Sequence, residues 1–227
     1  MLIASLFKAF SQLDDPRLRR VLGLGVLGAV VAYAALVAAA WLLLTRVDWL
    51  PQAWENTVVG VAGILSAVVL PLLFFPALVT LVMSPMLERV ADAVEERHYP
   101  QLNWPRPQPW AEVLATTLRF LLVTLAVNLA ALPVYGLLLF TGLAFPIAYA
   151  VNGYLLGREY FELVALRRLD PPRARQLYRD RLGQLWLGGI VIAFLFSIPV
   201  LNLAAPVIGA AFMTHVFQAL RRDALEL

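Results

Sequence analysis

The chain has 227 residues, of which 61% are hydrophobic and only 15% are charged. This apolar content exceeds what the core of a soluble domain needs, so the sequence predicts an all-α integral membrane protein. Its net charge of +3 does not indicate a nucleic-acid partner, because the basic residues lie in clusters beside apolar runs, as the flanks of membrane helices do.

Residues 1–20 are expected to form an interfacial helix and a turn that can hold an anion. Apolar residues recur at helical spacing from Leu2 to Leu13, so this segment is expected to lie along the membrane surface. Asp15 suits the N-cap, and Pro16 the first turn, of the helix that follows. Free N–H groups at this helix start and the arginines beside it would face one place, which favours anion binding. Arginines before an apolar helix also mark ordinary cytoplasmic flanks, so both interpretations stay open.

Two charge-free runs follow, and each is long enough to cross a membrane. Residues 21–45 comprise 25 residues without a charge, about 37 Å as a helix, against a hydrocarbon core of ~30 Å. A short link with Trp49 and Trp54 is expected at the interface, where the chain turns back. Residues 56–98 are predicted to form the second span, with an amphipathic cytosolic extension that ends near His98.

Residues 111–157 and 182–220 are predicted to form two helical hairpins. Each contains a long stretch without Asp, Glu, Lys or Arg, 38 residues in the first and 39 in the second, which is too long for one crossing and short for two. A proline divides each stretch near its middle, Pro133 in the first and Pro199 in the second. Because the arms are then short, the hairpins are expected to penetrate partly and turn inside the bilayer, with four short spans as the alternative.

The segment between the hairpins, residues 158–181, is predicted to be a basic cytosolic segment. At its start Arg158 and Glu162 are four residues apart and share one helix face. Such a pair is either a structural clamp or part of an aqueous path. The candidate pore or polar network comprises Asn152, Arg158, Glu159 and Glu162. The arginines that follow are expected to flank the membrane and to contact anionic lipids.

The basic residues predict the orientation, and no pattern indicates catalysis. Of the 18 Lys and Arg residues only Arg46 lies in the link between the two spans, so both termini are expected in the cytoplasm. With Lys8 as the only lysine and no cysteine, there is no Gly-rich phosphate loop with a lysine and no cysteine nucleophile. His98 and His215 are not in metal-ligand spacing, and His215 is expected to make a packing hydrogen bond. We therefore expect no enzymatic activity, no cofactor and no metal.

Three short motifs occur along the chain in a fixed order. They are Asp15-Pro16-Arg17-Leu18-Arg19-Arg20 with Lys8 before it, Met83-Ser84-Pro85-Met86-Leu87 ahead of an acidic and basic helix, and Ile198-Pro199-Val200-Leu201-Asn202-Leu203. In their order and spacing the chain resembles the CysZ sulfate permeases and the etoposide-induced protein family over nearly all of its length. The resemblance implies a multi-pass sulfate importer of the bacterial inner membrane that feeds cysteine synthesis and works as a homo-oligomer among membrane lipids.

The resemblance also implies functional residues. The sulfate motif of the family is a Gly-hydrophobic-Arg-Arg turn, which Leu18, Arg19 and Arg20 match, while Arg17 occupies the position where glycine is common. These four residues are the expected sulfate-binding residues. Two other functions fit the same layout. A membrane-shaping scaffold would not take up labelled sulfate, and a lipid-handling membrane protein would instead bind lipid near the face formed by residues 158–181.

Overall fold

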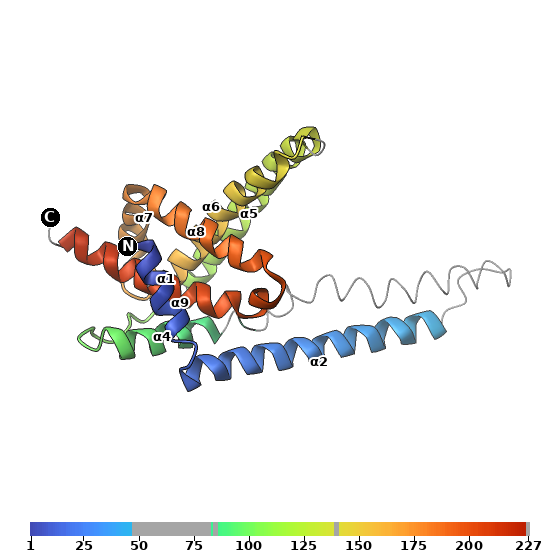
Figure 1. Cartoon of the computed structure of the whole chain (residues 1–227), viewed down its shortest axis with the longest axis horizontal. Coiled ribbons are helices and arrows are strands. Elements are labelled where there is room, and N and C mark those ends of the chain that lie inside the picture. The colour runs from blue at the N-terminus through green and yellow to red at the C-terminus, as the bar shows by residue number, and fades with distance from the viewer. Residues whose placement is uncertain (47–82, 84–85, 139–140, 226–227) are drawn as a thin grey trace.

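The computed structural model of the chain describes residues 1–46, 83, 86–138 and 141–225. Every regular element in these ranges is a helix, so the predicted all-α membrane protein is confirmed (Figure 1). Two of the helices contain segments long and apolar enough to cross a membrane, Pro16–Ala39 and Pro199–Arg222. Most of the predicted second span, residues 56–98, falls outside the described residues.

The N-terminal helices begin and end close to the predicted residues. Helix α1 (Leu2–Ser11) packs against the C-terminal helix, and α2 (Pro16–Arg46) extends away from the other labelled helices (Figure 1). The predicted N-cap is confirmed, because the Asp15 carboxylate accepts the backbone N–H of Arg17 at 2.9 Å. Only 17% of the most apolar stretch of α2 is buried, as expected of a helix that faces lipid.

The first hairpin differs from the prediction. Its arms are α5 (Trp110–Leu138) and α6 (Ala144–Ala165), and α5 continues through Pro133 instead of ending there. The turn comes later, at Gly142, whose φ of +75° is a conformation that glycine adopts at little cost. The expected turn at Pro133 is therefore wrong. With 29 and 22 residues, the arms are about 44 and 33 Å long, so neither is short against a ~30 Å core.

The second hairpin turns where it was predicted. Helix α8 (Leu182–Ser197) ends at extended Ile198, and α9 (Pro199–Leu225) begins at the next residue. Helix α7 (Pro171–Asp180) precedes it and was not predicted. Its start has a sequence signal all the same, because Asp170 accepts the N–H of Arg173 at 3.3 Å and a proline follows the cap.

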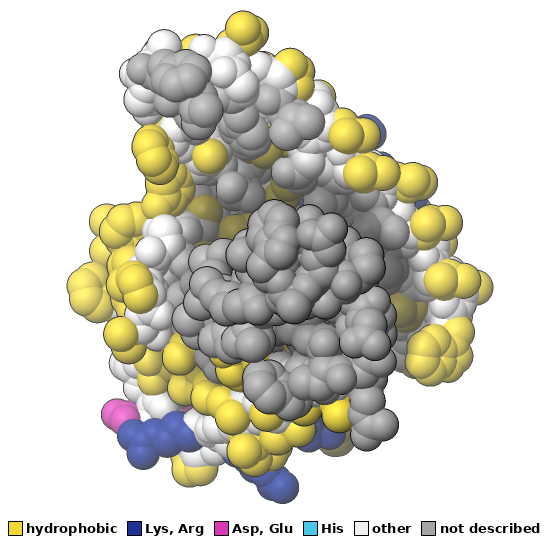
Figure 2. All heavy atoms as spheres, turned by 90° about the vertical axis from the view of Figure 1, so that its right-hand side faces the viewer, with side chains coloured by type: hydrophobic (Ala, Val, Ile, Leu, Met, Phe, Trp, Pro, Cys, Tyr) yellow, Lys and Arg dark blue, Asp and Glu magenta, His cyan; other side chains and the backbone are white. Residues whose placement is uncertain are grey.

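The core lies around α9, which packs against α1, α4 (Leu87–His98), α6 and α8. Between Ala205 and Gln218 every side chain of α9 is buried. On the outside, hydrophobic side chains cover much of the described part of one face, and charged side chains gather mainly at its lower edge (Figure 2). The exposed hydrophobic residues of α5 include Leu114, Leu118, Leu122, Leu125 and Leu129.

Candidate functional site

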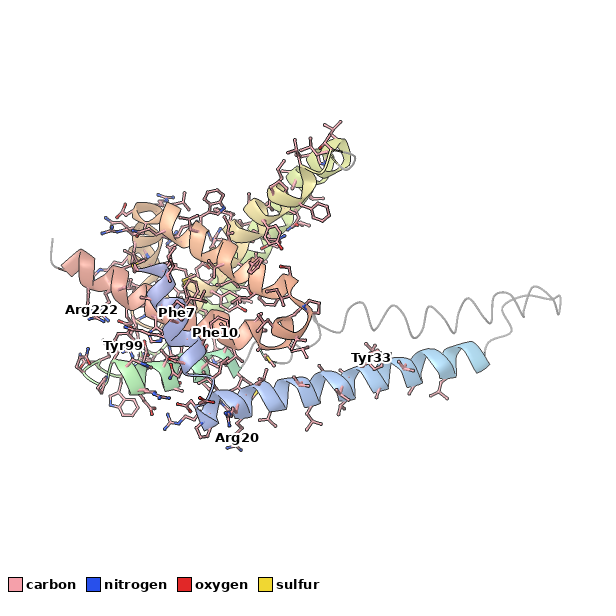
Figure 3. All side chains as sticks on the ribbon, in the orientation of Figure 1. Phe7, Phe10, Arg20, Tyr33, Tyr99 and Arg222 are labelled. Carbon is pink, nitrogen blue, oxygen red and sulfur yellow. The ribbon has the colours of Figure 1, made fainter. Side chains whose placement is uncertain are left out.

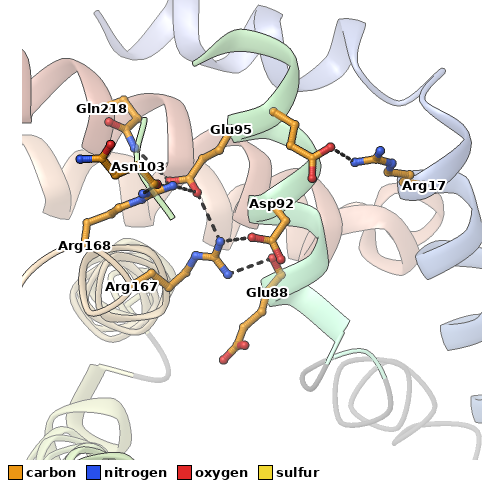
Figure 4. Close-up of polar contacts among 9 residues, drawn as sticks. Arg17, Glu88, Asp92, Glu95, Asn103, Arg167, Arg168 and Gln218 are labelled. Carbon is orange, nitrogen blue, oxygen red and sulfur yellow. Dashed lines mark hydrogen bonds and ion pairs between the residues drawn. The ribbon is translucent and has the colours of Figure 1, made fainter. Parts of the chain in front are cut away.

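The four residues predicted to bind sulfate lie at the start of α2, but they do not point to one place. Leu18 is 1% exposed and belongs to the core. Arg17 forms an ion pair with Glu96 of α4 (Figure 4). Arg19 donates to the Asp14 carboxylate at 2.5 Å and to the carbonyl oxygen of Leu13 at 3.3 Å.

Arg20 has different surroundings from its neighbours. Its side chain is exposed at the start of α2 (Figure 3), and it forms no ion pair with any carboxylate in the described part of the chain. The turn therefore contains two different arginines. Arg20 has no carboxylate partner among the described residues, and Arg19 is paired with Asp14, whose side chain is 85% exposed.

The predicted polar network lies on α6, and the structure brings two of its four members together. Arg158 Nε donates to Glu162 Oε1 at 2.9 Å, and the Arg158 side chain is 8% exposed. The Glu159 side chain is partly buried. Asn152 is exposed, and neither Asn152 nor Glu159 is part of the pair.

A pocket of about 520 Å³ lies beside the Arg158–Glu162 pair, among α5, α6, α7 and α8. We call it the arginine pocket, because four arginines and only two glutamates line it. The charged residues are Arg119 and Glu112 of α5, Arg158 and Glu162 of α6, and Arg175 and Arg179 of α7. Phe161, Leu166 and Leu182 form apolar parts of its wall. The sequence indicated the basic character of this region but not that α5 contributes to it.

A buried charge cluster joins α4 to the segment after α6 (Figure 4). Glu95 accepts hydrogen bonds from Arg168 at 2.6 and 3.1 Å and from Arg167 at 3.3 Å, and Arg167 also pairs with Asp92. The sequence predicted an amphipathic extension around Glu95 and a basic cytosolic segment around both arginines, but not a buried contact between them. The available signal was that Glu95 follows Ala91 by four residues, at the edge of the apolar stripe.

The expected packing role of His215 is confirmed. The Tyr99 hydroxyl and His215 Nδ1 are 2.9 Å apart in the interior, which joins the end of α4 to α9. The guanidinium of Arg222 lies 5.5 Å from the centre of the Tyr99 ring, in a cation–π arrangement (Figure 3). Among the described residues no group of three or more His, Cys, Asp and Glu side chains is placed to hold a metal ion.

Comparison with known families gives a match over residues 5–206, to the family described as sulfate transporter CysZ/etoposide-induced protein 2.4. The chain belongs to this family. The matched range contains Arg19 and Arg20 at the start of α2, the buried charge cluster around Glu95 and the arginine pocket. No curated protein matches the chain. The family is one of transporters, which agrees with an apolar helical chain that has no recognised catalytic pattern.

Proposed function

We propose that this member of the CysZ family is a permease that takes up sulfate across the bacterial inner membrane for cysteine synthesis. It is a multi-pass homo-oligomer with both termini in the cytoplasm. The family description and the apolar helices support transport across a membrane. The observation that carries the choice of an anion is the exposed Arg20 at the first helix start, beside Arg19 and without a carboxylate partner among the described residues.

Sulfate capture at this turn requires an exchange of partners. Arg20 meets the dianion first, and Arg19 then leaves Asp14 for a sulfate oxygen. Exposed ion pairs contribute only about 0–1 kcal/mol, so the Arg19–Asp14 pair costs little to break. Planar guanidinium groups suit tetrahedral oxyanions because each can donate two parallel hydrogen bonds.

Arg17 and Leu18 have supporting parts in this proposal. Buried Leu18 fixes the helix start against the core, and Arg17 ties it to Glu96 of α4. The anion then moves toward the interior along a polar route to which Asn152, Arg158, Glu159 and Glu162 contribute. The Arg158–Glu162 pair keeps the charge of this route balanced when no anion is present.

Replacing both capturing arginines, as Arg19→Ala/Arg20→Ala, is expected to weaken sulfate binding by a factor of about 100 or more. Each charged hydrogen bond contributes about 1.5–3 kcal/mol, and each 1.4 kcal/mol is a factor of ten. The measurement is calorimetric titration of the purified protein with sulfate at low ionic strength, where exposed charges are least screened. Arg89→Ala/Arg173→Ala is the matched control, because both of its arginines are exposed and lie outside the turn. Wild-type affinity in the first variant would remove the proposal.

Transport itself is tested by uptake into liposomes. The wild-type protein is expected to take up labelled sulfate, and Arg19→Ala/Arg20→Ala to take up little. Parallel assays with sulfite and chloride measure how selective the permease is. A scaffold or a lipid-handling protein predicts no sulfate uptake by the wild-type protein.

A further inference from the structure

The arginine pocket has more positive charge than its own carboxylates balance. Glu162 is held by Arg158, and Glu112 is held by Arg106 from outside the pocket. The other three arginines of the pocket form no ion pair with any carboxylate in the described ranges. They are Arg119, Arg175 and Arg179. The pocket is therefore suited to an anion, and the binding energy does not require breaking an existing pair.

Arg175 is held in position by a hydrogen bond to its own helix. Its Nε donates to the carbonyl oxygen of Pro171 at 3.0 Å, one turn earlier on α7. This bond uses the inner nitrogen and leaves the two terminal nitrogens for a ligand. Arg179 follows by four residues on the same helix face and lines the same pocket. Together they form a basic edge of α7 toward α5.

Tyr178 adds a neutral donor to the same pocket. It lines the pocket, and its buried hydroxyl has no hydrogen-bond partner within the described structure. The ring itself is well packed, with its centre 5.5 Å from that of Phe161. Burial raises the pKa of Tyr178 above its usual range, so the hydroxyl keeps its proton. A buried hydroxyl without a partner is costly, and a ligand oxygen would satisfy it.

The location favours a lipid over a free anion. The pocket opens at the base of the α5–α6 hairpin, where the exposed leucines of α5 mark a lipid-facing surface. Trp110 begins α5, is 87% exposed and is the residue type that marks the headgroup region. Phe161, Leu166 and Leu182 give the pocket an apolar wall, which a small hydrated anion does not need.

We propose that the arginine pocket binds the headgroup phosphate of an anionic phospholipid, with Arg175, Arg179 and Tyr178 as donors. The lipid tails then lie along the apolar side of the α5–α6 hairpin. This site is separate from the turn at the start of α2, and it shares only Arg158 and Glu162 with the proposed sulfate route. Its tetrahedral oxyanion is shared with free phosphate, which lacks the ester links and the tails.

The test is titration of the purified full-length protein in a neutral detergent with short-chain phosphatidylglycerol, phosphatidylcholine or inorganic phosphate. We expect phosphatidylglycerol to bind at least about tenfold more tightly than either of the others, because it combines a net negative charge with apolar tails. Equal binding of inorganic phosphate would overturn the lipid assignment in favour of a free-anion site. Equal binding of phosphatidylcholine would show that the arginines do not select charge, and would also overturn the proposal.

Variants locate the binding in the pocket. Arg175→Gln/Arg179→Gln is expected to weaken phosphatidylglycerol binding at least about tenfold, while the exposed Arg89→Gln/Arg173→Gln pair changes it less than about twofold. Tyr178→Phe is expected to weaken it by a factor of about three to ten without lowering thermal stability, since it removes only a hydroxyl that lacks a partner. Wild-type affinity in both pocket variants would overturn the proposal.

Discussion

Glu95→Gln is expected to lower the free energy of unfolding by about 3–5 kcal/mol, the cost of leaving buried charges without their partner. The side chains of Glu95, Arg167 and Arg168 are only 5%, 5% and 8% exposed. Without the Glu95 charge Arg168 has no ion pair left among the described residues, and Arg167 has only Asp92. Water cannot compensate at these exposures, so most of the loss appears as stability.

The hydrogen bonds of Glu95 join three separate parts of the chain. Its two oxygens accept from Arg168 Nε and Nη2 as a fork, and Oε1 also accepts from Gln218 Nε2 at 3.0 Å (Figure 4). One side chain of α4 thereby connects the segment after α6 with α9. Its loss is expected to loosen three parts of the fold at once.

Thermal unfolding of the purified protein in detergent, followed by circular dichroism, measures this effect. Glu96→Gln is the matched control, because Glu96 is the next residue, its side chain is 63% exposed and its one ion-pair partner among the described residues is exposed Arg17. The control is expected to lose less than about 1 kcal/mol. Adding Arg168→Gln to Glu95→Gln should recover part of the loss, since it removes one uncompensated charge. Similar losses in both single variants would contradict the buried-charge explanation.

Local signals in the sequence were sufficient to predict where several helices begin. The Asp15-Pro16 pair marked the start of α2, and Pro199 marked the start of α9, because caps and prolines act on the adjacent backbone alone. The same signal at Asp170 marked α7 but was interpreted as part of a basic segment. The turn predicted at Pro133 was wrong because a proline can be accommodated within a long helix. The hairpin turns at Gly142 instead.

Long-range partners could not be predicted from the sequence. The arginines at the start of α2 were located correctly, but the Arg17–Glu96 pair joins residues 79 apart in the chain. Arg167 and Arg168 resembled membrane flanks because a run of arginines has the same composition whether it faces water or a buried carboxylate. The arginine pocket likewise requires Arg119 of α5 to meet α7, which depends on how the hairpin packs.

Gly189→Ala is expected to destabilise the fold by about 3 kcal/mol or more, because it forces apart two helices that touch backbone to backbone. A Cβ at this position would overlap the carbonyl oxygen of Gly153 and lie 2.5 Å from the nitrogen and 2.7 Å from the Cα of Gly157. All three atoms belong to the backbone of α6 and cannot rotate away. Overpacking costs about 1–3 kcal/mol where side chains can adjust, so a backbone collision is expected at the upper end or beyond.

Gly183→Ala is the matched control within the same helix. Apart from its own stretch of helix backbone, no atom of the described residues lies within 4 Å of a Cβ placed at Gly183, so the change adds no contact with another helix. Alanine is favoured over glycine in a helix by about 0.5–1 kcal/mol, so this variant is expected to be as stable as the wild-type protein or slightly more so. Thermal unfolding in detergent compares the two, and equal midpoints would show that α6 and α8 can separate freely.

Because Arg158 lies one residue after Gly157, the same separation is expected to widen the arginine pocket, so Gly189→Ala should also weaken phosphatidylglycerol binding while Gly183→Ala leaves it unchanged.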